Sequence, residues 1–259
     1  MTSRMVGEEA FATDSAHGDR EPVLIDVHYT LCTTSPELKA VSCVGRRVIQ
    51  GDQRDAVVLS TNQVTAELET ATEVFSLGPD MQPEPIWTTL PVAAQVLAAL
   101  ANARLSIGWS GVTVGSGAYA DLLAGMASHL GAREPVQLQT TDMASIAAVD
   151  GVAPVFFSVG LGNRDLDELM RAVPERSMII LLDDVSSPSI PVDFYDTIHR
   201  KSLGVITPTA RPSAAHYARA RRLVAMRLAP GYESPPVHVV AGGQHAHPPD
   251  SPTVILQWR

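Results

Sequence analysis

The chain has 259 residues and a formal net charge of −9, and 45% of its residues are hydrophobic. This length accommodates one large or two small domains with a substantial core, as in an ordinary globular protein. The negative charge, without a basic face, argues against a nucleic-acid partner. Two cysteines, Cys32 and Cys43, supply neither a disulfide scaffold nor a four-thiolate zinc site, so we expect a reducing, cytoplasmic location.

The first segment, residues 1–21, is polar and acidic and contains no apolar stretch. This composition predicts a disordered tail rather than a secretion signal. No apolar run in the chain approaches the roughly 20 residues that a membrane-spanning helix needs. We therefore expect no membrane partner.

The next part of the chain carries strand signals. Runs rich in β-branched residues predict strands at residues 23–29, 47–49 and 56–59, with a turn around Gly51 and Asp52. Prolines and glycines predict a linker at residues 77–87. Thr88 or Thr89 is then expected to cap a helix that begins at residue 90 and carries Pro91 in its first turn.

From residue 111 onward, strand and helix signals alternate. Strands are expected at residues 111–114, 136–140, 155–160, 178–182 and 203–206. Helices are expected at residues 118–130, 144–149, 166–173, 192–200 and 213–227. This order predicts an α/β protein with a doubly wound parallel sheet. Strands return at residues 237–240 and 254–258, so both chain ends are β-rich.

A G-x-G-x-x-A pattern stands where the first of these strands meets its helix. Gly115 would allow a tight turn, Gly117 would let the backbone approach a pyrophosphate at the helix N-terminus, and Ala120 would keep helix and strand close. The cofactor-binding residues expected on this basis are Gly115, Ser116, Gly117, Ala118 and Tyr119, together with Thr140, Thr141 and Gly160 at later strand ends. The other interpretation is that the glycines only let a strand turn into a helix.

Several segments match one family in chain order. VLIDVHYTLCTTSPEL at residues 23–38 precedes VGRRV at residues 44–48; a helix and strand at 90–114 precede KSLGVI at 201–206. These segments resemble the medium-chain dehydrogenase/reductase superfamily of alcohol dehydrogenases and quinone reductases. The resemblance implies a Rossmann-type nucleotide-binding domain at residues 89–228 and a reduced β-rich lobe built from residues 22–88 and 229–259. It also implies a homodimer, because sheets of nucleotide-binding domains pair edge to edge in that family.

The chain departs from this family at its zinc and ribose sites. Of the family's catalytic zinc ligands, only one has a counterpart in this chain, and it is Cys32. The four-cysteine structural zinc lobe of the family is absent from the sequence. One thiolate does not hold tetrahedral zinc, so we expect no zinc. The acidic residue that binds the ribose hydroxyls should lie near residues 139–141, and Asp142 stands about two residues late. NAD and NADP therefore both remain candidate cofactors.

Candidate catalytic residues are few. Cys32 and Thr34 could supply a thiolate and a hydroxyl relay, although a small buried cysteine at the end of a strand is the commoner case. Asp183 ends an apolar strand, where doubly wound sheets place ligands, and could act in acid–base chemistry or cap a helix. His245 and His247 could bind metal or form an exposed loop.

The leading hypothesis is a zinc-independent NAD(P)-dependent oxidoreductase in a biosynthetic pathway. It would act on a small carbonyl, enone or alcohol substrate. The alternatives are a non-redox enzyme on the same scaffold, such as a cyclase, lyase or isomerase, and a non-catalytic binding protein. Fold alone does not choose among them.

Overall fold

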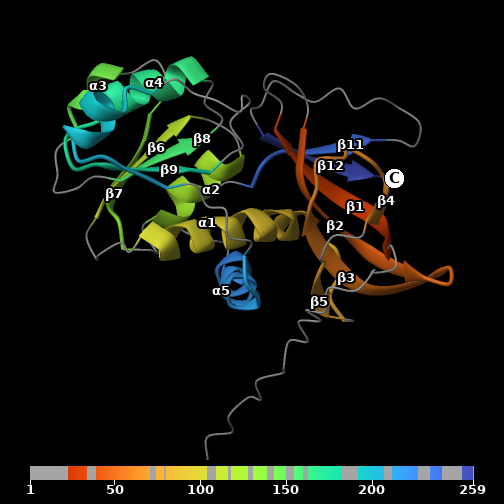
Figure 1. Ribbon diagram of the computed structural model, residues 1–259. Coiled ribbons are helices and arrows are strands. Elements are labelled where there is room, and N and C mark those ends of the chain that lie inside the picture. Colours follow the sequence, from red (N-terminus) through yellow and green to blue (C-terminus); the bar gives the residue numbers. More distant parts are fainter. Residues whose placement is uncertain are drawn as a thin grey trace, which may run out of the picture.

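Two β-sheets and their packed helices make up the part of the chain that the computed structural model describes (Figure 1). The described residues are 23–33, 39–70, 74–78, 80–103, 109–115, 118–127, 131–138, 143–149, 155–159, 163–182, 192–206, 212–226, 234–240 and 253–258. Sheet A is mixed and contains segments from both ends of the chain, whereas sheet B is parallel and comes from its middle. The expected α/β architecture is therefore confirmed.

Sheet A is built around one long hairpin. Its strands are β1 (Val23–Thr33), β2 (Lys39–Ile49), β3 (Asp52–Ser60), β4 (Glu67–Thr70), β5 (Phe75–Gly78), β11 (Val237–Val240) and β12 (Thr253–Trp258). They lie in the order β11-β12-β1-β2-β3-β5, and β4 pairs with β1. The β2–β3 turn is at Gln50 and Gly51, one residue earlier than expected, and both have positive φ, as a two-residue hairpin turn requires.

The two faces of sheet A pack against different partners. Alternate side chains of a strand point to opposite faces, so Val57 and Leu59 join one apolar cluster while Ala56 and Val58 join another. The second cluster contains the helix α1 (Leu90–Ala103) and reaches Ile180 of sheet B. Helix α1 thus links the two sheets through a continuous core, as its position between them in Figure 1 shows.

A short 3₁₀ helix, η1 (Pro85–Thr89), leads into α1. The expectation that Thr88 or Thr89 caps α1 is wrong, because both lie inside η1 and their hydroxyls donate to the carbonyls of Pro85 and Ile86. The predicted linker also contains the end of β5 and the start of η1. The hydroxyl of Ser42 on β2 donates to the carbonyl of Thr88, which fixes η1 on sheet A.

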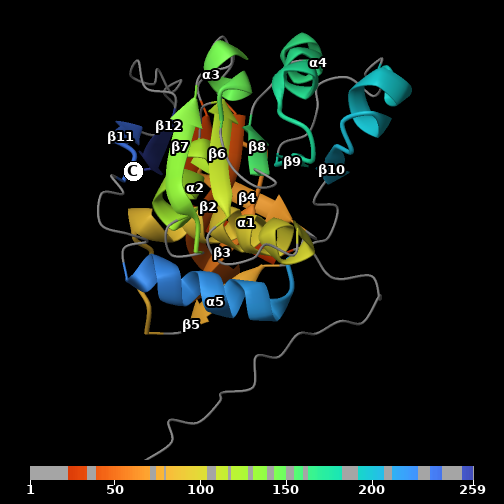
Figure 2. The same cartoon turned by 90° about the vertical axis from the view of Figure 1, so that its left-hand side faces the viewer.

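Sheet B consists of parallel strands. The chain adds its second strand on one side of the first, and the later strands on the other side. Its described strands are β6 (Ser110–Gly115), β7 (Arg133–Leu138), β8 (Val155–Val159), β9 (Met178–Leu181) and β10 (Gly204–Ile206). Figure 2 shows them from left to right as β7, β6, β8, β9 and β10. Counted in chain order this is 2-1-3-4-5, one strand fewer among the described residues than the six-stranded dinucleotide-binding order.

Helices cover both faces of sheet B. On one face, α2 (Ala118–Ala127), α5 (Ala214–Ala225) and α1 share a core with Val155 and Ile180. On the other face, α3 (Met143–Ala147), α4 (Asn163–Ala172) and the π-helix η3 (Phe194–His199) pack near Phe156 and Ile179. Successive residues of β8 and β9 alternate between these cores, which explains the continuous apolar runs in the sequence. None of the described helices is long and apolar enough to cross a membrane.

Candidate cofactor site

The strand order of sheet B reverses at β6 and β8. The chain leaves β6 toward β7 on one side and leaves β8 toward β9 on the other. Doubly wound sheets bind ligands in the crevice outside the carboxyl ends of such a strand pair. Here the pair ends with Val114 beside Ser158 and Gly115 beside Val159. The arrowheads of β6 and β8 in Figure 1 point toward the side of the molecule that holds sheet A.

Gly115 has the backbone conformation that the glycine pattern requires. It is the buried last residue of β6 and has φ of 117°, a conformation that residues with a side chain rarely adopt. Helix α2 begins three residues later at Ala118, so its N-terminal N–H groups lie just beyond the end of β6. Ala120 is fully buried, as expected for the residue that keeps helix and strand close. Strand, glycine turn and helix therefore occur in the expected order.

Tyr119 ties the first turn of α2 to α1. Its hydroxyl donates to Oε1 of Gln95, and its half-buried ring packs against the core that α1 and α2 share. This phenol oxygen is thus engaged by the protein. The sequence placed Tyr119 among the cofactor-binding residues, and its contacts assign it the further task of holding α2 in place.

Cys32 lies in an apolar environment. Its side chain is fully buried in a cluster with Ala40, Val240, Val254 and Leu256. Burial raises the pKa of the Cys32 thiol to about 12, so it stays protonated at neutral pH. Since the thiolate is the nucleophile and the metal ligand, this environment favours the structural interpretation of Cys32.

The remaining expected site residues lie outside the part of the chain that the structure describes. They are Ser116, Gly117, Thr140, Thr141, Gly160, Thr34, Asp183, His245 and His247. Of Ala118 the structure describes the backbone, as the first residue of α2. The described site therefore consists of Gly115, the start of α2, and the ends of β6 and β8.

Zinc does not fit the donor set of the described residues. Among them no three His, Cys, Asp or Glu side chains come close enough together to hold a metal ion. The one thiol that matches a zinc ligand of the resembled family, Cys32, is enclosed by aliphatic side chains.

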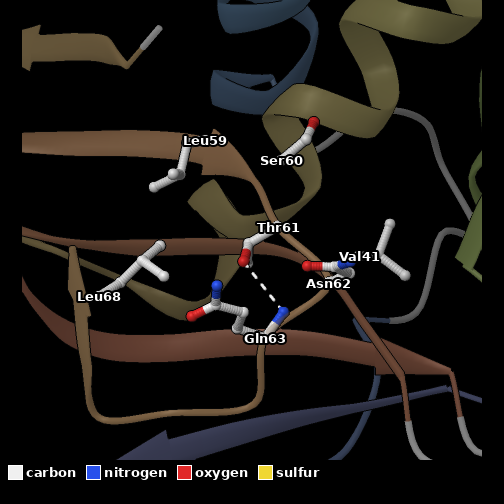
Figure 3. Close-up of a pocket in the computed structure, with 7 residues that line it drawn as sticks. All are labelled: Val41, Leu59, Ser60, Thr61, Asn62, Gln63 and Leu68. Atoms are coloured by element: carbon white, nitrogen blue, oxygen red, sulfur yellow. Dashed lines mark hydrogen bonds between the residues drawn. The ribbon is translucent and has the colours of Figure 1, made fainter. Parts of the chain in front are cut away.

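A pocket of about 330 Å³ opens beside the end of β3 (Figure 3), and no motif in the sequence pointed to it. We call it the β3 pocket. Among the residues that line it, Leu59 and Leu68 are buried, and the others are half-buried or exposed: Val41, Ser60, Thr61, Asn62 and Gln63. In the sequence, this pocket is marked only by four consecutive uncharged polar residues, 60–63, that follow an apolar run. The same pattern is typical of an ordinary loop.

The fold occurs in solved dehydrogenases. Galactitol-1-phosphate dehydrogenase from Escherichia coli matches with a TM-score of 0.65 at 12% identity, over 93% of each chain. Alcohol dehydrogenase from Thermus sp. ATN1 matches with a TM-score of 0.62 at 13% identity, over 92% of each chain. A Sinorhizobium meliloti protein bound to NADP matches with a TM-score of 0.66 at 11% identity, over 92% of each chain.

Sequence comparison adds nothing to these structural matches. No family model matches the chain, and no curated protein matches it by sequence. Identities of 11–13% with matches over more than nine-tenths of the chain establish a common fold. The resemblance inferred from the sequence is thus confirmed in three dimensions: this chain has the fold of the zinc-type medium-chain dehydrogenases.

Proposed function

We propose that the chain is an NAD(P)-dependent oxidoreductase of the medium-chain type that works without zinc. Its dinucleotide binds in the crevice outside β6 and β8. Its substrate is a small carbonyl, enone or alcohol. The observation that carries this proposal is the positive φ of Gly115 at the point where the strand order reverses, directly before α2.

The described residues fit a pyrophosphate in three respects. Gly115 ends β6 with a positive φ, and because it is a glycine no Cβ stands at the strand end. The first N–H groups of a helix have no intrahelical acceptor, so the start of α2 supplies donors and the positive end of the helix dipole. The bond from Tyr119 to Gln95 holds that helix end against α1. The bound nicotinamide would supply the hydride chemistry, and this chain's residues would bind and orient it.

The direct test is nucleotide binding by the full-length protein. Calorimetric titration of the wild type with NADH and NADPH should give saturable binding of at least one of them. The Gly117→Val variant should lose it, because a side chain there occupies the volume of the pyrophosphate. The Gly204→Val variant places the same side chain at the start of β10, where a Cβ meets no atom nearer than 3.8 Å, and should retain binding.

A different result identifies the alternative class. If neither nucleotide binds to the wild type, the crevice serves a non-redox enzyme or a binding protein, and the oxidoreductase proposal is wrong. If Gly117→Val binds as tightly as the wild type, the glycine turn is structural only.

We further propose a homodimer formed through sheet B. Strand β10 lies at the edge of this sheet, and Val205 on it is 39% exposed. An unpaired strand edge without charged side chains favours pairing with another strand. Two copies related by a two-fold axis would join their sheets through this edge.

A further inference from the structure

Helix α5 carries a positive charge, although the chain as a whole has a net charge of −9. The helix reads AAHYARARRLVA, with three arginines and no aspartate or glutamate. None of the other described helices contains more Lys and Arg than Asp and Glu. Among the described helices, α5 is therefore the one whose surface favours an anionic partner.

One side of α5 packs on the protein and the other is open to solvent. Tyr217 stacks on Phe75 of β5 with ring centroids 4.8 Å apart, and Ala220 and Val224 are buried. The opposite side carries an exposed stripe at intervals of four, three and four residues: Ala215, Arg219, Arg222 and Met226. Residues at these spacings line one face of a helix. We call Arg219, Arg222 and Met226 the basic face of α5.

The arginines of the basic face have no acidic neighbour on their own helix. Three arginines in or beside other helices each pair with a carboxylate four residues away, at N–O distances of 2.9–3.1 Å: Arg164 with Glu168, Arg171 with Asp167, and Arg200 with Asp196. No described residue forms such an ion pair with an arginine of α5. The charge of this helix is thus left for a partner outside the described part of the chain.

The N-terminal part of the chain has the complementary charge. Residues 5–19 lie outside the residues that the structure describes, and we call them the acidic segment. They contain no Lys or Arg and four acidic residues: Glu8, Glu9, Asp14 and Asp19. They also contain one phenylalanine, Phe11, which suits the thioether side chain of Met226, a residue that is 64% exposed.

The acidic segment is tethered within reach of α5. Phe11 precedes Val23, the first residue of β1, by twelve residues, and an extended chain of that length spans about 40 Å. This is roughly the width of a globular chain of 259 residues. A short tether gives the segment an effective concentration of about 1 mM or more, so weak surface charge pairs suffice for contact.

We propose that the acidic segment, residues 5–19, docks on the basic face of α5 in the same chain. Its carboxylates pair with Arg219 and Arg222, and Phe11 contacts Met226. Because these charges lie at the surface, salt weakens the contact. The inference does not depend on nucleotide binding at sheet B.

A nitroxide attached to the Ala12→Cys variant of the full-length ¹⁵N-labelled protein tests this contact, because it broadens the amide resonances of nearby residues. The native thiols do not take up the label, since Cys32 and Cys43 are only 0% and 1% exposed. We expect a loss of amide intensity at Arg219–Met226 and none in α4. Raising the ionic strength from about 0.1 M to about 1 M shortens the screening length from about 10 Å to about 3 Å and should restore the intensity.

Charge reversals identify the surface that the segment contacts. Arg219→Glu/Arg222→Glu should abolish the intensity loss in α5. Arg54→Glu/Arg164→Glu changes the net charge by the same amount, at exposed positions on β3 and α4, and should leave the loss unchanged.

A variant of the acidic segment gives the same test without altering the folded part. Changing its two glutamates to glutamine and its two aspartates to asparagine should also abolish the intensity loss. Full intensity in α5 of the tagged protein, a loss that persists in either neutralised or reversed variant, or a loss that grows with protein concentration would each overturn the proposal. The last result would place the contact between molecules.

Discussion

The hydroxyl of Tyr119 on α2 donates to the side-chain carbonyl of Gln95 on α1, so the helix that follows the glycine turn is fastened to the helix that packs on sheet A. Helix α1 contributes buried side chains to the core that contains both sheets. The position of the proposed pyrophosphate donors therefore depends on a contact between two helices. It does not depend on the glycine turn alone.

Removing this hydroxyl tests its role. Tyr119→Phe should lower the free energy of unfolding by about 1 kcal/mol, because the partly buried Gln95 amide loses its donor. Urea denaturation measures this change, and Tyr195→Phe, at a site that is 64% exposed, should leave stability unchanged. A variant that unfolds like the wild type but loses nucleotide binding would show that the hydroxyl serves the ligand instead.

Gly115 and Gly51 provide a matched pair of positions with positive φ. Both have positive φ, and Gly51 lies in the β2–β3 turn of sheet A, where a Cβ would meet no other group within 4 Å. Alanine at either position should cost about 1–2 kcal/mol of stability from backbone strain. Only Gly115→Ala should also weaken nucleotide binding in calorimetry. Equal loss of binding in both variants would mean that the effect comes from stability.

The buried thiols predict a stability change at alkaline pH. Burial raises the pKa of Cys32 and Cys43 from 9.0 to about 12, so the protonated thiol is favoured in the folded state. This stabilisation is complete below pH 9 and is lost as the pH rises toward 12, by about 1.4 kcal/mol per pH unit for each thiol. As the pH rises from 9 toward 12, the wild type should therefore lose more stability than Cys32→Val. Parallel curves would show that Cys32 is accessible to water.

The position of β10 at the edge of sheet B leads to a prediction about the oligomeric state of the protein. Light scattering should give twice the 27.6 kDa mass of the chain. Val205→Lys places a charge on the edge of sheet B and should give the monomer mass. Val239→Lys does the same on β11, an edge strand of sheet A where Val239 is 45% exposed, and should leave the dimer intact. A wild-type monomer across a wide concentration range would contradict the proposal.

We also predict that the purified protein contains no bound zinc. Elemental analysis of protein purified without chelator should find far less than one zinc ion per chain, because Cys32 has no partner with ligand spacing in the sequence. A stoichiometric ion would instead direct attention to His245 and His247. Removing it with a chelator would then show whether it supports folding or activity.

The sequence by itself determined the local features of this protein. The apolar run at residues 178–182 predicted a strand covered on both faces, because a side-chain period of two leaves no polar face in such a strand. Gly115 predicted a turn for a similarly local reason, since few residues other than glycine adopt its φ of 117°. Alternating strands and helices then predicted the parallel sheet, as the crossover rules require.

Tertiary structure decided the features that join distant segments. Thr30 accepts a hydrogen bond from Trp258, 228 residues away, and β12 covers Cys32 through Val254. No local pattern encodes such a pairing, so the sequence offered a buried Cys32 as the commoner of two interpretations but did not reveal which strand covers it. The β3 pocket arises in the same way, because Leu68 reaches it only through the pairing of β4 with β1. Contacts between segments far apart in the chain, rather than local propensities, made these sites.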